Sequence, residues 1–264
     1  MALGLACHQH HDTQGFLPQS RWAHSYSHLP HLLPYLELQS AYVRGNVVEN
    51  PRPQSSAAHF LSSLEVPAFF CASDGSPRTH DNVNSYNPGV FDKGAITNYV
   101  GVGGAGHGHL YSLAEGGGWE LATDYPYFDP NCNGDSTDNG QGFFYRSDYR
   151  RKLTFAKVED GLSNTVMMGE ILPERTQWSQ WAHACHGMTM AIPPNARKAD
   201  GSFYDRNDYA NVWGAHSSHP GGVQFVFGDG HVEFVPESTS DAVYRAWGTI
   251  NGGEPGQCRK TPFE

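Results

Sequence analysis

The stretch HSSHPGGVQFVFGDGHVEFV, from His216 to Val235, decides the fold, because it predicts a β-hairpin. Apolar residues alternate with other residues over Val223–Phe227, and a second apolar run covers His231–Val235. Between them lies Asp229-Gly230, and a D-G turn between two alternating runs is the strongest short-range hairpin signal. Asp and Gly both tolerate the positive φ that such a turn requires. We therefore expect the two runs to pair as antiparallel strands.

The same stretch carries an alternative reading as a metal site formed by His216, His219 and His231. An H-x-x-H spacing differs from the i, i+4 pair that a zinc-protease helix presents, and Pro220-Gly221-Gly222 would break a helix there. Further histidines lie in the segments His107–His109 and His183–His186. Loop histidines that are solvated or hydrogen-bonded are the simpler interpretation, so the hairpin is favoured.

The composition predicts a β-containing protein with many loops. The 264 residues include 30 Gly, 17 Pro, 14 Phe and 13 Tyr, a mixture rich in turn residues and large rings and poor in helix formers. The formal net charge of −10 argues against a nucleic-acid partner and against adsorption to anionic lipid, since both need a basic face.

The order of the expected elements indicates an α+β fold with an antiparallel sheet in a single domain, residues 1–264. We expect the end of an N-terminal helix at residues 1–14, strands separated by long loops, and a short helix after Ser240. Loop insertions are expected at residues 105–150 and 177–209. The other expected elements are a short amphipathic helix within His28–Asn46 and strands within Ser63–Pro77, Ala95–His109 and Thr165–Leu172.

The cysteines leave the redox state open. Cys7, Cys71, Cys132, Cys185 and Cys258 are widely spaced and form no C-x-x-C pair, which disfavours a zinc ribbon or a thioredoxin-type site. One or two disulfides are compatible with this spacing, with at least one thiol remaining. Their pairing cannot be derived from the sequence.

The segment DPNCNGDSTDNGQG is the best candidate for a cation site. Its oxygen-bearing side chains alternate as in a calcium loop, with Gly134 at the sixth position. Gly140 stands at the twelfth position, where an EF-hand has its bidentate carboxylate, and flanking helices are absent. An Asn/Asp-rich turn remains the alternative. The expected Ca²⁺ ligands are Asp129, Asn131, Asn133, Asp135 and Asp138.

The sequence shows no catalytic motif and favours a protein that is not an enzyme. A nucleophile elbow, a Walker loop and a strand–helix GxGxxG are all absent. The hydroxyl and carboxyl groups of DGLSNT, Asp160 to Thr165, more simply satisfy backbone donors at a turn. A metal-dependent hydrolase using the histidine-rich loops remains an alternative, as does a glycan-binding module using the aromatic segment WSQWAHACHGM, residues 178–188.

Six blocks occur in order along the chain: HDTQGFLP, LLPYLE, VPAFFCASD, TNYVG, EDGLSNTVMMGE and HPGGVQFVFGDGHVEFV. Together they resemble large prepilin-like bacterial proteins, which carry an N-terminal cleavage/methylation helix and a C-terminal domain of unknown function. The last two blocks are the most specific, and in the last of them His231 stands where a small residue is usual. The resemblance covers about Leu3 to Val235.

This resemblance implies a pilin-like fold in which an N-terminal helix packs on an antiparallel sheet. It also implies an extracellular or cell-surface subunit that assembles with itself or with other pilin-like subunits into a pilus, pseudopilus or other filament. We expect that a segment upstream of Met1 is missing, namely the apolar half of the pilin helix, through which such a protein would contact the membrane. Type II secretion pseudopilins look similar in ordering a loop with calcium, which strengthens the expectation for Asp129–Asp138.

Overall fold

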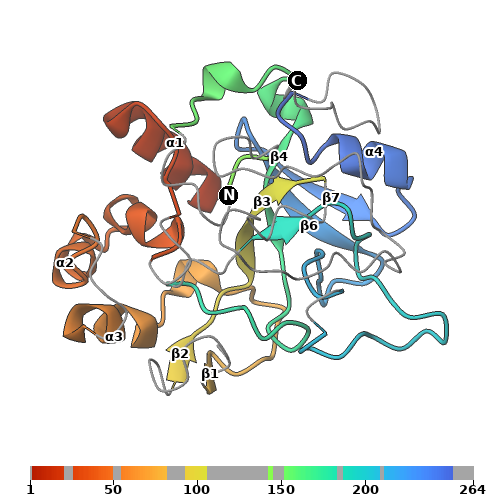
Figure 1. The fold of residues 1–264 in the computed structure, drawn as a ribbon, viewed down its shortest axis with the longest axis horizontal. Helices are drawn as coiled ribbons and strands as arrows, with labels where there is room; N and C mark the ends of the chain where they lie inside the picture. The colour runs from red at the N-terminus through yellow and green to blue at the C-terminus, as the bar shows by residue number, and fades with distance from the viewer. Residues whose placement is uncertain are drawn as a thin grey trace, which may run out of the picture.

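A five-stranded sheet forms the centre of the computed structural model, with helices on either side (Figure 1). The structure describes residues 2–20, 26–49, 55–81, 93–105, 142–144, 152–182, 187–208 and 211–251. The strand order is β5-β3-β4-β6-β7. These strands are β3 (Tyr99–Gly104), β4 (Val166–Glu170), β5 (Met188–Thr189), β6 (Gly222–Phe227) and β7 (Val232–Pro236).

The predicted hairpin is confirmed as β6 and β7. Antiparallel pairing runs from Gly222 opposite Pro236 to Val226 opposite Val232. Gly230 has φ +90°, a conformation in which a side chain would be strained. Asp229 accepts a hydrogen bond at Oδ1 from the backbone N–H of His231, at 3.1 Å. Gly230 thus has the positive φ that the sequence indicated, whereas Asp229 keeps a negative φ and contributes through its side chain.

The N-terminal helix is also confirmed, as α1 (Ala2–Gln14). It packs against the β6–β7 hairpin, where His8 Nε2 lies 2.9 Å from the carbonyl oxygen of Gly228. Gly4 allows this approach, since a Cβ there would lie 2.8 Å from Val226 Cγ1. The helix ends at Gly15, whose φ is +78°. None of the helices in the described ranges is both long and apolar enough to cross a bilayer.

The segment after α1 contains several short helices instead of one helix and a strand. Residues 28–46 form η1 (Leu29–Leu36), a 3-10 helix, and α2 (Gln39–Arg44). Pro34 inside η1 lacks the N–H that an α-helix would need there. The expected strand within Ser63–Pro77 is wrong, because α3 (Ser56–Ser63) and η2 (Pro67–Phe69) lie there. The Ser55 side chain caps α3 by accepting from the N–H of Ala58 at 3.1 Å.

The α+β class is confirmed, but the sheet is mixed and not purely antiparallel. β3 pairs with β4 in the antiparallel direction and with β5 in the parallel direction. β5 comes from residues 177–209, which were expected to be only a loop insertion. The remaining elements are β1 (Thr79–Asp81) paired with β2 (Lys93–Ala95), the 3-10 helices η6 (Phe155–Lys157) and η7 (Leu162–Asn164), and α4 (Asp241–Ala246), the expected C-terminal helix.

Apolar side chains cover the sheet on both faces. Phe225 and Val235 belong to a buried cluster that includes Tyr244 of α4. Met168 and Val226 belong to a second cluster with Leu3 of α1 and residues of η1, α2 and α3. Figure 1 shows α1, α2 and α3 on one side of the sheet and α4 on the other. A strand such as β4, with all five residues buried, must therefore be apolar or have its polar groups paired.

A buried histidine in the helical layer makes the fold sensitive to acid. The His28 side chain has no solvent exposure and stacks on Phe144 with ring centroids 4.3 Å apart. Burial lowers its pKa from 6.5 to about 3. Because this pKa is depressed in the folded state, the unfolded chain takes up the proton first when the pH falls. Stability is therefore lost progressively as the pH falls below about 6.5 and until it reaches about 3.

We expect His28→Leu to reduce the loss of stability between about pH 7.5 and about pH 5, because no proton can then bind at this position in the unfolded chain. Urea unfolding at both pH values measures the effect. His59→Leu, at an exposed position of α3, is the matched control and should keep the dependence of the wild type. Equal pH dependence in His28→Leu and the wild type would contradict the assignment.

Candidate functional site

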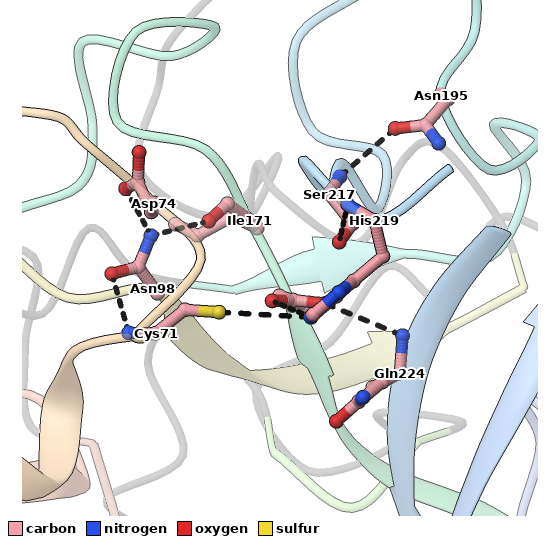
Figure 2. Close-up of polar contacts among 9 residues, drawn as sticks. Cys71, Asp74, Asn98, Ile171, Asn195, Ser217, His219 and Gln224 are labelled. Carbon is pink, nitrogen blue, oxygen red and sulfur yellow. Dashed lines mark hydrogen bonds and ion pairs between the residues drawn. The ribbon is translucent and has the colours of Figure 1, made fainter. Parts of the chain in front are cut away.

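Three side chains with metal-ligating or catalytic chemistry converge from distant parts of the chain. They are Cys71, in the turn after η2, Glu170, the last residue of β4, and His219, in the loop before β6. His219 Nε2 lies 3.7 Å from Cys71 Sγ and 3.5 Å from Glu170 Oε1. All three ligand atoms lie within 4.8 Å of one another. Figure 2 shows Cys71 and His219 pointing toward each other across the end of the sheet.

The cluster is largely shielded from water. The Cys71 residue is 6% exposed and Glu170 is 1% exposed, whereas the His219 side chain is 25% exposed. A buried carboxylate is costly unless charges or hydrogen bonds compensate it. Its other oxygen, Oε2, accepts a hydrogen bond from the backbone N–H of Gln224, but at 3.4 Å. Compensation for burying the Glu170 carboxylate therefore depends on the groups that lie near Oε1.

Asn98 fixes the Cys71 side of the cluster. Its side-chain oxygen accepts from the N–H of Cys71 at 2.9 Å, and its amide nitrogen donates to Asp74 and to the carbonyl oxygen of Ile171 (Figure 2). The backbone of Asn98 also bonds to Phe69 and Ile171. Because Ile171 follows Glu170 directly, one buried amide holds two of the three converging segments in register.

The His219 side of the cluster is held by the loop that precedes β6. The backbone N–H of His219 donates to Ser217 Oγ at 3.0 Å. The N–H of Ser217 donates to Asn195 Oδ1 at 2.9 Å (Figure 2), and Asn195 in turn donates from Nδ2 to Glu237 at 2.7 Å. The backbone that leads into His219 is therefore tied, through Ser217 and Asn195, to Glu237 beyond β7.

The geometry differs from that of a nucleophilic triad. In such a triad the histidine takes the proton of the nucleophile at one ring nitrogen and is oriented by an acid at the other. Here the thiol and the carboxylate both lie against Nε2. Burial raises the pKa of the Cys71 thiol, and the contact with Glu170 raises it further, whereas a reactive cysteine has a lowered pKa.

The three histidines that the sequence suggested as a metal site, His216, His219 and His231, do not lie together. His216 is buried, its Nδ1 lies 3.0 Å from the carbonyl oxygen of Gly214, and burial lowers its pKa to about 4. His231 Nδ1 pairs with Asp229 Oδ1 at 2.6 Å at the exposed hairpin turn. Only His219 of the three joins a cluster, and its partners are Cys71 and Glu170. The segments His107–His109 and His183–His186 lie outside the described residues.

The predicted calcium ligands Asp129, Asn131, Asn133, Asp135 and Asp138 also lie outside the described residues. Of the cysteines, the described residues include Cys7 and Cys71, and both are free and buried. In the aromatic segment considered for glycan binding, Trp181 is fully buried and its ring centroid lies 5.0 Å from that of Phe69. Trp178 stacks on Trp213 at the same separation. Both rings thus have packing partners within the domain.

Sequence reasoning missed the cluster, although a signal was present. Cys71, Glu170 and His219 each lie in a block on which the resemblance to prepilin-like proteins was based, and so does Asn98.

A cavity of about 210 Å³ adjoins the cluster on the α1 side of the sheet. Tyr99 lines this cavity, and burial raises the pKa of its hydroxyl group.

Comparison with known proteins gives one family. A family model described as "Protein of unknown function (DUF1559)", SBP_bac_10, matches residues 2–242. The match includes all the residues of the cluster and every strand of the sheet. No curated protein and no solved structure matches the chain.

We expect Asn98→Ala to destabilise the fold by about 3 kcal/mol or more, because it leaves several buried partners of the amide without hydrogen bonds. The free energy of unfolding in urea measures the loss. Asn164→Ala is the matched control, since Asn164 is exposed and its side chain donates only to the carbonyl oxygen of Asp160. A loss in Asn98→Ala no greater than in the control would show that the amide does not hold these segments.

Proposed function

The chain belongs to the DUF1559 family, and we propose that it is a pilin-like, non-enzymatic subunit at the cell surface that acts by self-assembly. Family membership supports this proposal, because proteins of the family are typically prepilin-like. The packing of α1 on the β6–β7 hairpin supports it as well. A helix lying on a largely antiparallel sheet is the arrangement that a pilin-like subunit would need.

The observation that carries self-assembly is the exposed apolar surface of β7. This strand is last in the sheet order, so its outer edge has no strand partner among the described residues. Val232 is 42% exposed and Phe234 is 44% exposed, and the two lie on the same face of the strand. Val232 also lines the cavity that Ala2 and Leu3 of α1 border. An unprotected edge with exposed apolar side chains is a surface on which another chain can pair.

The non-enzymatic part of the proposal rests on the geometry of the Cys71–Glu170–His219 cluster. A thiol with a raised pKa that shares one imidazole nitrogen with a carboxylate is poorly placed for nucleophilic attack. The alternative of a hydrolase would require a substrate to reach a cluster in which two of the three residues are buried. The proposed partners are other copies of the chain or other pilin-like subunits, with glycan contacts and anchoring by a pilin-type helix as secondary possibilities.

We expect the pair of substitutions Val232→Lys and Phe234→Lys to weaken self-association by about tenfold or more, because a loss of about 1.4 kcal/mol of apolar contact corresponds to that factor. Sedimentation velocity over a range of protein concentrations measures it. Val43→Lys, at the 66% exposed Val43 of α2, is the control and should leave association unchanged.

A wild-type chain that stays monomeric in its native cellular form would contradict the proposal. The proposed location at the cell surface is tested separately, by adding a membrane-impermeant labelling reagent to intact cells that produce the protein. We expect labelling of the intact cells. Labelling that occurs only after lysis would exclude the surface location.

We further propose that Asp129, Asn131, Asn133, Asp135 and Asp138 bind Ca²⁺ through their oxygen atoms, with the weak affinity of extracellular calcium modules. Calorimetric titration of the full chain with Ca²⁺ should give a dissociation constant in the range of about 0.1 to 1 mM. The double substitution of Asp129→Asn and Asp135→Asn should abolish the heat of binding. Unchanged binding in that variant would assign the calcium to other carboxylates.

A further inference from the structure

We propose that Cys71, Glu170 and His219 bind a Zn²⁺ ion that ties together three segments distant in the sequence. The segments are the turn after η2, the end of β4 and the loop before β6. This inference goes beyond the proposed surface function and does not depend on it. A thiol, an imidazole and a carboxylate are the three side-chain types that zinc uses in proteins.

The distances between the ligand atoms match the edges of a zinc tetrahedron. With Zn–S near 2.3 Å, Zn–N near 2.05 Å and Zn–O near 2.1 Å, a tetrahedral angle places sulfur and nitrogen about 3.6 Å apart and nitrogen and oxygen about 3.4 Å apart. The Cys71 Sγ–His219 Nε2 distance is 3.7 Å, and the His219 Nε2–Glu170 Oε1 distance is 3.5 Å. Two of the three edges therefore fit, and the third, between Cys71 Sγ and a Glu170 carboxylate oxygen, is no longer than 4.8 Å.

The same distances are less suitable for a direct ion pair. A charge-assisted hydrogen bond between imidazolium and carboxylate is about 2.7 to 2.9 Å long, whereas His219 and Glu170 are 3.5 Å apart. The exposed hairpin turn provides a contrast within the same chain. There the direct pair of His231 Nδ1 with Asp229 Oδ1 is 2.6 Å long, whereas His231 Nε2 lies 3.7 Å from Glu233 Oε2, beyond the length of a direct hydrogen bond.

Charge balance also favours a bound dication. Glu170 is buried, and the N–H of Gln224, at 3.4 Å, is the one backbone donor that its carboxylate has within the described residues. On zinc binding the Cys71 thiol loses its proton to solvent and forms the Zn–S bond. Thiolate, carboxylate, neutral imidazole and Zn²⁺ together carry no net charge, so the buried unit avoids the cost of an isolated ion.

The surrounding hydrogen bonds orient each ligand as outer-shell groups do in metal sites. Asn98 holds the backbone of Cys71, Ser217 holds the backbone of His219, and Gln224 occupies Oε2 of Glu170 so that Oε1 faces the cluster (Figure 2). The partly exposed His219 side leaves room for water as the fourth ligand. Thiolate and imidazole favour zinc over Ca²⁺ or Mg²⁺, which prefer oxygen ligands.

The metal content of the full chain, purified without a tag and dialysed against zinc-containing buffer, tests the proposal. We expect Cys71→Ser and His219→Gln each to bind about one Zn²⁺ fewer per chain than the wild type. Cys7→Ser and His231→Gln are the matched controls and should keep the wild-type stoichiometry. Cys7 is buried and free but has no place in the cluster, and His231 is a histidine with carboxylate partners of its own.

Cobalt substitution identifies the ligand directly. Co²⁺ bound at this site should give an ultraviolet sulfur-to-cobalt charge-transfer band in the wild type and in Cys7→Ser, and the band should be lost in Cys71→Ser. A band that persists in Cys71→Ser would place the thiolate at another cysteine and overturn the proposal. Wild-type protein that binds Ca²⁺ or Mn²⁺ in this assay but no Zn²⁺ would also overturn it.

Thermal unfolding separates loss of the ion from loss of the fold. With a chelator present, Cys71→Ser and the wild type should unfold at similar temperatures, because both then lack the ion. Added Zn²⁺ should raise the unfolding temperature of the wild type and leave that of Cys71→Ser unchanged, since a ligand stabilises only the fold that binds it. Equal zinc-induced shifts in the two proteins would show that the ion binds elsewhere.

Discussion

The hydrogen bonds of the buried Asn98 side chain join the η2 turn to the end of β4, and the arrangement of the cluster depends on them. Asn98 has no solvent exposure, yet both ends of its amide and its backbone N–H and C=O are paired. A group buried so completely is costly to leave unpaired, so it acts as a strict constraint on its partners. Cys71 and Ile171 take their positions from it, and Glu170 is placed beside Ile171.

The local signals in the sequence predicted the parts of the fold that are themselves local. The Asp229-Gly230 turn, the alternation on either side of it and the helix before Gly15 all depend on interactions between near neighbours in the chain. The strand expected within residues 63–77 is wrong. Apolar residues of that segment are buried by short helices that pack against one another, and not by strand pairing. The parallel pairing of β5 with β3 was not predictable either, because it joins segments that share no turn.

The candidate cluster could not be assembled from the sequence for the same reason. Cys71, Glu170 and His219 have no spacing that relates them, and their proximity results from the order of the strands. One local signal was available: Glu170 ends an apolar run that was expected to be a buried strand, and a carboxylate in that position needs a partner. His216, His219 and His231 are neighbours in sequence, which suggests a common site, but the fold brings His219 together with residues of other elements.

The position of the cluster also bears on how a domain with long loops keeps its sheet in register. The β3–β4 and β4–β6 pairs unite strands that are far apart in sequence, so loop closure opposes their pairing. Asn98 offsets this cost at the β3–β4 junction, and contacts between Glu170, Gln224 and His219 act at the β4–β6 junction. Both junctions lie at the same end of β4. Polar contacts concentrated there constrain the central strand directly at the end where its two neighbours meet it.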